Sequence, residues 1–210
     1  MQFQYEFGTP GGSLQNAASS KYQNTAATGA SGEVRTANLL RKIQQGRKAA
    51  ERFAVIHDVM LPSSKYTANI DHIVVAGRQV LIIDSKVWSS GVYATIRGKT
   101  YVYHSSTTKN DFNKRLARFE PADLKTLPMT VNLLDKWLQN ASISYAVFMR
   151  PALLIWPPSG KTLPFLWLYR PQGTTDVLTA KNALDRLALA IPHQTPDRRL
   201  LDQLLTLRSG

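Results

Sequence analysis

Apolar and polar residues follow one another in patterns that predict both helices and strands. Residues 31–45 carry apolar side chains at near-helical spacing, so we expect a helix there, with Ser31 as its N-cap and Gly46 at its end. Short apolar runs bounded by turn residues predict three strands, at residues 52–61, 66–75 and 79–87.

The same mixture continues to the end of the sequence. Further elements are expected as a hairpin over 91–105, a helix over 122–140 interrupted by Pro128, strands within 142–156 and 162–170, and helices at 179–191 and 195–207. The last helix would begin with Thr195 as its N-cap and Pro196 as its first residue. This order of elements predicts an α/β fold with a central mixed β-sheet flanked by helices.

Changes in composition divide the chain into three segments. Residues 1–30 are rich in small and polar residues and predict a flexible N-terminal lead-in. Residues 31–156 contain the first helix and most of the strands, and we expect them to form the core. Residues 157–210 then add a C-terminal strand and helices that pack on that core.

The balance of charge narrows the choice of partner. The chain has 26 basic and 14 acidic residues and a net charge of +12, which favours a polyanion such as nucleic acid, although a basic protein kept soluble by its charge is the simpler alternative. No apolar run is as long as a membrane helix, so we expect no membrane partner. The absence of cysteine excludes disulfides and thiolate metal sites and is typical of a cytoplasmic protein.

Several kinds of enzyme find no support in the motifs. Four histidines without cysteine do not make a zinc cluster, and no serine nucleophile elbow is present. The tetrapeptides at 97–100 and 159–162 resemble the end of a phosphate-binding loop but lack its first glycine, so an NTPase is not expected. His57 and His104 lie in strand-like segments, where packed or surface histidines are commoner than catalytic ones.

Two aspartates and a lysine interrupt the apolar strands at 66–75 and 79–87. If Gly77 and Arg78 form a two-residue turn, the register places Asp71 opposite Asp84, with their Cβ atoms roughly 5 Å apart. Lys86 lies two residues beyond Asp84 and projects from the same side of the sheet. A three-residue turn would separate the pair, so this expectation depends on the type of turn.

Two carboxylates this close repel one another unless a cation lies between them. Hard oxygen ligands suit Mg²⁺, for which Mn²⁺ is expected to substitute. A lysine beside such a metal can orient or deprotonate a water molecule or hold a phosphate oxygen. The alternative is a structural cluster of buried ion pairs, which would stabilise the fold only weakly. Together, the two aspartates and the lysine are the smallest set of side chains that metal-assisted hydrolysis of a phosphodiester requires.

These residues, with three other motifs in the same order, resemble a known family. "GE" at 32–33, "HDVMLP" at 57–62, "NIDHIVV" at 69–75 and "VLIIDSKVWSSGVY" at 80–93 resemble the nuclease-related domain, NERD, of the PD-(D/E)xK nucleases. The resemblance covers about residues 31–95 and implies a restriction-endonuclease-like core. It further implies a catalytic set of Glu33, Asp71, Asp84 and Lys86.

The same resemblance implies the metal ligands. Asp71 and Asp84 would bind the metal through their carboxylates, and Ser85 would bind it through its backbone carbonyl. Glu33 would complete or support the metal shell, directly or through a water molecule, although an acid in a first helical turn is also favourable without any site. His72 follows Asp71 on the opposite strand face and is expected to pack or to support the site rather than to bind metal.

We therefore expect a Mg²⁺-dependent nuclease, in the first place a DNA endonuclease that uses a Mg²⁺-activated water, with RNA left open as a substrate. Basic residues between 34 and 52, and between 97 and 125 near Tyr101 and Tyr103, could contact phosphates and bases, although a solvated face explains any one of them equally well. The alternative is a non-catalytic nucleic-acid-binding or scaffold domain that keeps the nuclease fold. A homodimer is also considered, because cutting both strands of a duplex needs two sites.

Overall fold

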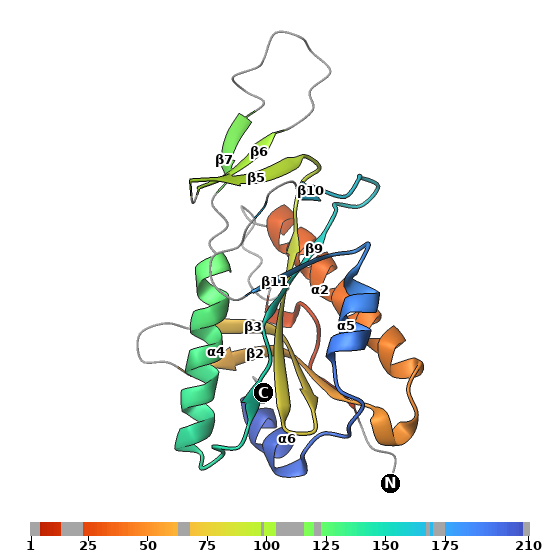
Figure 1. Cartoon of the computed structure of the whole chain (residues 1–210), viewed down its shortest axis with the longest axis vertical. Helices are drawn as coiled ribbons and strands as arrows, with labels where there is room; N and C mark the ends of the chain where they lie inside the picture. Colours follow the sequence, from red (N-terminus) through yellow and green to blue (C-terminus); the bar gives the residue numbers. More distant parts are fainter. Residues whose placement is uncertain are drawn as a thin grey trace.

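The structure is a computed structural model, and it describes residues 5–13, 23–62, 68–97, 99–103, 116–119, 123–166, 169 and 175–207. Figure 1 shows a central sheet with helices on both faces and a smaller sheet at one end of the molecule. Within the described residues, no helix is both long enough and apolar enough to span a bilayer. The mixed α/β architecture expected from the sequence is confirmed.

The central sheet contains seven strands among the described residues, in the order β1-β2-β3-β4-β9-β11, with β8 also paired to β4. Its strands are β1 (Glu6–Phe7), β2 (Ala54–Leu61), β3 (Ala68–Ala76), β4 (Gln79–Val87), β8 (Val147–Phe148), β9 (Ala152–Trp156) and β11 (Asp176–Thr179). The β2–β3 and β3–β4 pairs are antiparallel, whereas β1–β2, β4–β8, β4–β9 and β9–β11 are parallel.

The smaller sheet takes three strands from the segment that follows the central hairpin and one, at residues 165–166, from the segment that follows β9. Its order is β10-β5-β6-β7, from β5 (Val92–Ile96), β6 (Lys99–Tyr103), β7 (Leu116–Phe119) and β10 (Phe165–Leu166). The hairpin predicted over residues 91–105 is confirmed as β5 and β6. Four α-helices and one short 3-10 helix complete the described part of the fold: α2 (Gln23–Gln45), α4 (Asp123–Asn140), α5 (Ala183–Ala190), α6 (Arg198–Leu205) and η1 (Ala49–Glu51).

The β3–β4 hairpin has the register that the sequence predicts. Ala76 pairs with Gln79 across a two-residue turn, and the ladder continues to the pair His72 and Ile83. Gly77 opens the turn with φ of 58°, a left-handed conformation that glycine adopts without steric penalty. The two-residue turn is therefore confirmed, and the same register carried one step further sets Asp71 opposite Asp84.

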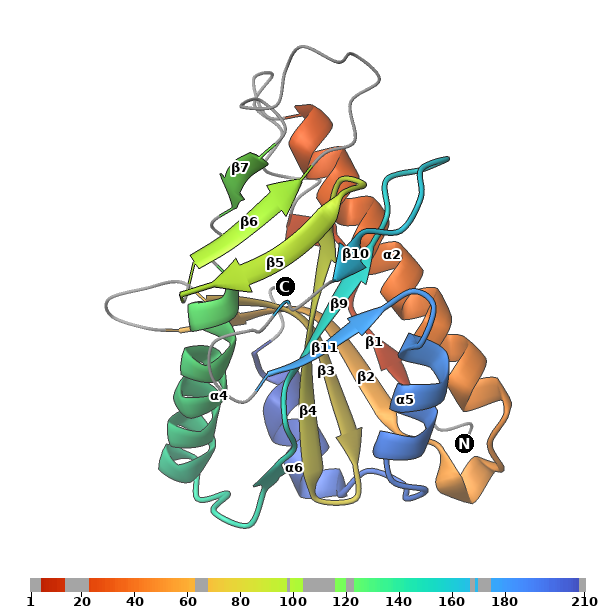
Figure 2. The same ribbon diagram turned by 45° about the horizontal axis from the view of Figure 1, so that its top comes forward.

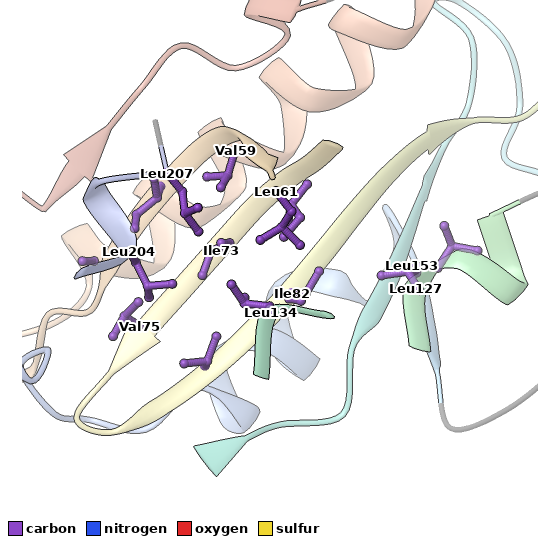
Figure 3. Packing of buried hydrophobic residues seen from close by; sticks show 14 of the residues in the cluster. Val59, Leu61, Ile73, Val75, Ile82, Leu127, Leu134, Leu153, Leu204 and Leu207 are labelled. Carbon is purple, nitrogen blue, oxygen red and sulfur yellow. The ribbon is translucent and has the colours of Figure 1, made fainter. Parts of the chain in front are cut away.

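Alternation along the strands divides the core into two layers. Ile73, Val75 and Ile82 belong to the layer beneath α4 and α6, where they are buried together with leucines of both helices (Figure 3). Val74 and Ile83 point to the other face and are buried beneath α2 and α5. Each strand thus has helices on both faces, and its buried side chains make a rigid support for the residues at its end.

The two strands of the hairpin separate just beyond His72 and Ile83. On the far side β4 stays paired with β9 up to Val87 and Trp156, whereas β3 stays paired with β2. Figure 2 shows β2 and β3 curving away from β4 and β9 at this end. The resulting fork begins at the level of Asp71 and Asp84.

Three predicted helix starts are wrong, and one of them is that of α5, which begins at Ala183 because Thr179 belongs to β11. Helix α2 begins at Gln23, so Ser31 lies inside it and is not its N-cap. Its hydroxyl donates to the carbonyl of Thr28 instead, which a serine within a helix can do. Helix α6 is capped by Asp197, whose carboxylate accepts the Leu200 amide, two residues after the predicted N-cap Thr195. A carboxylate serves that amide better than a hydroxyl because the bond is charge-assisted.

The three-segment division stays a prediction, but its outer segments contribute to the central sheet. Residues 6–7 of the expected lead-in form β1, and residues 23–30 form the first turns of α2. Strand β11 has no counterpart among the predicted elements and extends the sheet beside β9. The sequence also suggests a short helical piece over residues 14–24, of which 14–22 lie outside the described residues and 23–24 belong to the start of α2.

Candidate active site

The fork between β3 and β4 brings together the three charged residues singled out in the sequence. Lys86 Nζ lies 2.7 Å from Asp84 Oδ1 and 3.8 Å from Asp71 Oδ2. Only 9% of the Asp71 side chain and 15% of the Asp84 side chain are exposed, whereas 30% of the Lys86 side chain is. The ammonium group is the accessible member of the cluster, and it compensates two carboxylates that are largely removed from water.

Ser85 connects this cluster to the opposite face of β4. Its backbone amide donates to Asp71 Oδ2 at 2.8 Å, and its buried hydroxyl lies 2.7 Å from Thr36 Oγ1 of α2. Burial and the neighbouring Asp84 carboxylate raise the pKa of Asp71 well above its usual range, although Lys86 opposes this rise. A buried carboxyl of this kind is stabilised in its ionised form when a further cation approaches.

Glu33 reaches the same end of the sheet from α2. The residue is 2% exposed, and burial raises the pKa of its carboxyl to about 7, with Asp58 and Asp84 adding to the rise. Helix α2 can approach β4 closely because residue 32 is glycine: a Cβ there would lie 2.9 Å from Val87 Cγ2. In the "GE" dipeptide, Gly32 therefore lets α2 pack closely on β4, and Glu33 places an acid beside the cluster.

Asp58 is a further acid at the site that the sequence reasoning did not select. It lies in β2 between residues that pair with His72 and Ile70, which places it opposite Asp71. Its φ of 54° is left-handed, which is uncommon for a residue other than glycine. One carboxylate oxygen accepts the Ser13 amide at 2.6 Å, and the other is buried with no hydrogen-bond partner among the described residues. Asp58 could have been found from the sequence as an acid within an apolar strand, because the same pattern identified Asp71.

Two buried histidines support the site from behind. His57 and His72 face one another at 2.7 Å between their Nδ1 atoms, and His72 Nε2 lies 3.1 Å from Ser85 Oγ. At the other end His57 Nε2 lies 3.0 Å from Glu6 Oε1. His72 is fully buried on the face opposite Asp71, where it packs against Ser85 as the sequence predicts. His104 lies outside the described residues.

The donor set at the fork suits a hard divalent cation. Among the described residues, no three side chains of histidine, cysteine, aspartate or glutamate gather closely enough to hold a metal by themselves. Mg²⁺ seldom requires this, because it keeps several waters and combines one or two carboxylates with oxygens of the substrate. Asp71 and Asp84, with Lys86 compensating their charge, fit such a partly hydrated site.

Some of the basic residues expected to contact phosphate have structural roles instead. Arg47 is buried and donates to the carbonyls of Ala188, Ile191 and Pro192, which close the end of α5. Arg41 pairs with Glu6. The prediction is therefore wrong for Arg47, since the unpaired carbonyls at a helix end are strong acceptors for a guanidinium.

Other basic residues stay at the surface. Lys42 and Lys48 are exposed, as are Arg97 and Lys99 at the tip of the β5–β6 hairpin. Tyr101 and Tyr103 are half-buried in β6. Most of the basic residues between 104 and 122 lie outside the described part of the chain.

Comparison with protein families gives one match. The model described as "NERD: Nuclease-related domain" matches residues 28–149, more than half of the chain, and includes Glu33, Asp58, Asp71, Asp84 and Lys86. Neither the curated proteins nor the solved structures provide a match. Residues 5–13, which contact Glu33 and Asp58, lie outside the matched range.

Proposed function

Because the chain belongs to the nuclease-related domain family, we propose that it is a metal-dependent nuclease that hydrolyses phosphodiester bonds. The observation that carries this proposal is the fork, where Asp71 and Asp84 share one lysine at the end of two strands that then separate. We further propose that this part is a PD-(D/E)xK core, with Asp71 as its first acid and Asp84-Ser85-Lys86 as its second motif.

The proposed cofactor is Mg²⁺, or Mn²⁺ in its place. When bound, the cation supplies charge neutralisation at the scissile phosphate and activates the attacking water. Asp71 and Asp84 bind it through carboxylate oxygens, and the Ser85 carbonyl is the third protein ligand. The Ser85 amide keeps Asp71 in place by donating to the oxygen Oδ2.

Lys86 is the most exposed of the three charged residues at the fork. Its side chain is 30% exposed, whereas the Asp71 side chain it contacts is 9% exposed. In the proposed reaction Lys86 leaves one of its carboxylate partners and donates a hydrogen bond to the attacking water or to a phosphate oxygen. Glu33 supports the site from α2, because its negative form strengthens cation binding and is favoured above pH about 7.

DNA is the proposed substrate, with internal cleavage as the proposed mode. The net charge of +12 favours a phosphodiester polymer over a small substrate. The exposed bases Lys42, Lys48, Arg97 and Lys99 are candidates for contacts with the backbone phosphates. RNA as a substrate, and a homodimer as the active form, stay predictions.

A cleavage assay tests the proposal directly. Supercoiled plasmid and single-stranded DNA are incubated with the protein in Mg²⁺, in Mn²⁺ and in EDTA, alongside Asp84→Ala and Lys86→Ala. Asp202→Ala is the matched control, because this acid pairs with Arg198 at an exposed position of α6. We expect metal-dependent cleavage by the wild type and by the control, and a loss of at least 100-fold in the two site variants.

The alternative of a non-catalytic nucleic-acid-binding domain predicts a different result. Such a domain would bind DNA with strong salt dependence, and neither metal nor Asp84→Ala would change its effect on the DNA. Absence of cleavage by the wild type in both metals would overturn the nuclease proposal. Equal cleavage by wild type and Lys86→Ala would overturn the assignment of the site.

A further inference from the structure

We propose that the N-terminal segment of residues 5–13 is a positioning element of the active site, which holds Glu33 and Asp58 in place through its backbone amides. This segment lies outside residues 28–149, the range that the family model matches. The inference rests on the proposed function, since it assigns these contacts a role in binding the cation at the fork.

The segment is first fixed to the sheet. Glu6 and Phe7 form β1, which pairs in parallel with β2 at Val55 and Ile56 and lies beside that strand in Figure 2. The Val55 amide also donates to the carbonyl of Tyr5 at 2.8 Å. A two-residue strand with these bonds fixes the direction in which the chain continues.

A charged contact adds to this attachment. Glu6 accepts a forked pair of hydrogen bonds from the Arg41 guanidinium of α2, and its Oε1 also faces His57 Nε2. Forked arginine–carboxylate pairs are geometrically specific. The segment is thereby fixed both to β2 and to the helix that carries Glu33.

Two glycines then bring the backbone close to the site. Gly8 has φ of 84°, and a Cβ there would overlap the carbonyl oxygen of His57. Gly11 has φ of 75°, and a Cβ there would lie 2.9 Å from Ala30 Cβ. Only glycine permits both the left-handed conformation and the close approach, so the path between β2 and α2 depends on these two positions.

The path ends on two acids of the site. The Gly11 amide donates to Glu33 Oε2 at 2.8 Å, and the Ser13 amide donates to Asp58 Oδ2 at 2.6 Å. Ser13 is held in turn by Asn69, whose side-chain amide donates to the Ser13 hydroxyl at 3.0 Å. Hydrogen bonds from amides to carboxylates are charge-assisted and about twice as strong as neutral ones. One short segment therefore fixes an acid on α2 and an acid on β2.

Such contacts determine how well a carboxylate is placed for a cation. Groups that hold metal-binding residues from behind typically change metal affinity or activity by about 10-fold to 100-fold when removed. Without the Gly11 amide, the Glu33 side chain would be free to take other rotamers, and the negative charge beside Asp84 would be less well fixed. The segment should therefore matter for binding of the metal even before DNA is added.

Gly11→Ala tests the inference, with Gly160→Ala as its matched control. Gly160 has a similar left-handed φ of 68°, but nothing lies within 4 Å of a Cβ placed there. Both variants therefore introduce the same kind of backbone strain, and only Gly11→Ala disturbs the contact with Glu33 and Ala30. Binding of Mn²⁺ to the full-length protein is measured by electron paramagnetic resonance without DNA, and folding is followed by circular dichroism.

We expect Gly11→Ala to weaken Mn²⁺ binding by about 10-fold and Gly160→Ala to leave it unchanged. Equal Mn²⁺ affinity in the two variants would overturn the positioning role while leaving the nuclease proposal intact. A wild-type protein that binds no Mn²⁺ and cuts no DNA would instead overturn the proposed function itself.

A second measurement applies if Gly11→Ala does not fold. The wild-type protein is titrated with Mg²⁺ and its amide resonances are followed by NMR. The Gly11 and Ser13 amides should shift with the same concentration dependence as the Ser85 amide, whereas the amide of Gly46, which follows the last residue of α2 about 20 Å from Glu33, should not. Shifts at Ser85 without shifts at Gly11 and Ser13 would contradict the inference.

Discussion

His57 and His72 share a hydrogen bond between like atoms, with 2.7 Å separating the two Nδ1 nitrogens. Because burial lowers the pKa of both rings, both are expected to be neutral at pH 7, and only one of them can donate in this bond. Glu6 accepts hydrogen bonds, so the neutral His57 ring should carry its proton on Nε2. His72 must then donate from Nδ1, and its Nε2 lies 3.1 Å from Ser85 Oγ, whose hydroxyl donates to Thr36 Oγ1.

The pair should be visible as two opposite tautomers. Nitrogen NMR at pH 7 is expected to show a proton on Nε2 of His57 and on Nδ1 of His72, with the exposed His193 as the internal comparison. Two Nε2–H rings would contradict the arrangement. Since both pKa values lie below the ordinary 6.5, the stability that the neutral rings provide is complete above pH 6.5 and is lost as the pH falls below it.

Lys86→Ala and Lys86→Arg should separate stability from catalysis. Removing the ammonium takes away the cation that pairs with Asp71 and Asp84 in the described part of the chain, which we expect to destabilise the metal-free protein by on the order of 1 kcal/mol, given the partial exposure of Lys86. Lys86→Arg restores the charge and most of that stability, but its planar guanidinium replaces a compact ammonium. Urea unfolding and plasmid cleavage measure the two effects. Cleavage by Lys86→Arg at the wild-type rate would contradict a role specific to lysine.

Glu33→Gln should stabilise the metal-free protein at alkaline pH. The folded-state pKa of about 7 lies above the ordinary 4.5, so the contribution of Glu33 to stability is greatest below pH 4.5 and is lost as the pH rises through 7. Glutamine can still accept the Gly11 amide and carries no charge to bury. At pH 8.5 we expect the variant to be more stable by on the order of 2 kcal/mol, with a smaller difference at pH 5. An equal difference at both pH values would contradict the raised pKa.

Gly32→Ala should impair the site through packing, in contrast to Gly46→Ala. Alanine within a helix gains about 1 kcal/mol over glycine, but a Cβ at residue 32 lies 2.9 Å from Val87 Cγ2. Overpacking of this kind costs about 1–3 kcal/mol, so the loss should exceed the gain and displace α2 from β4. At Gly46 the nearest atom is 3.5 Å away. Thermal unfolding and cleavage rates check this: both should fall for Gly32→Ala only.

Removal of metal should lower the melting temperature. A cation that binds the folded state alone stabilises it by mass action, so Mg²⁺ or Mn²⁺ at 100 times its Kd should add about 2.7 kcal/mol. For a chain of this length that corresponds to roughly 5–10 °C, measured by calorimetry at pH 8 and reversed by EDTA. Asp84→Asn should abolish the increase, and an increase that survives in this variant would place the metal elsewhere.

Much of the central hairpin follows from local pattern alone. Apolar runs at residues 68–76 and 79–87 on either side of a glycine predict the hairpin, and a two-residue turn between them sets its register. The position of Asp71 opposite Asp84 then follows by counting. The register also places Lys86 on the side of Asp84, and its contacts with both carboxylates agree with this.

Contacts between segments far apart in the chain could not be predicted from local sequence pattern. The position of Asp58 opposite Asp71 depends on the register of β2 against β3. The role of Arg47 depends on its contacts with the end of α5, far along the chain. The start of α2 at Gln23 was missed because small and polar residues there have weak helical preferences that packing can override.

The sequence by itself determined the apolar strands and the charged residues within them, and it set Asp71 opposite Asp84 on the condition of a two-residue turn, because turn length fixes the register within one hairpin. Only the tertiary structure decided what surrounds them: the fork between β3 and β4, the histidine pair behind Ser85, and the N-terminal segment on Glu33 and Asp58. The segment's contacts with the two acids are made by backbone amides, which every residue except proline possesses, so no residue type in the sequence could reveal them.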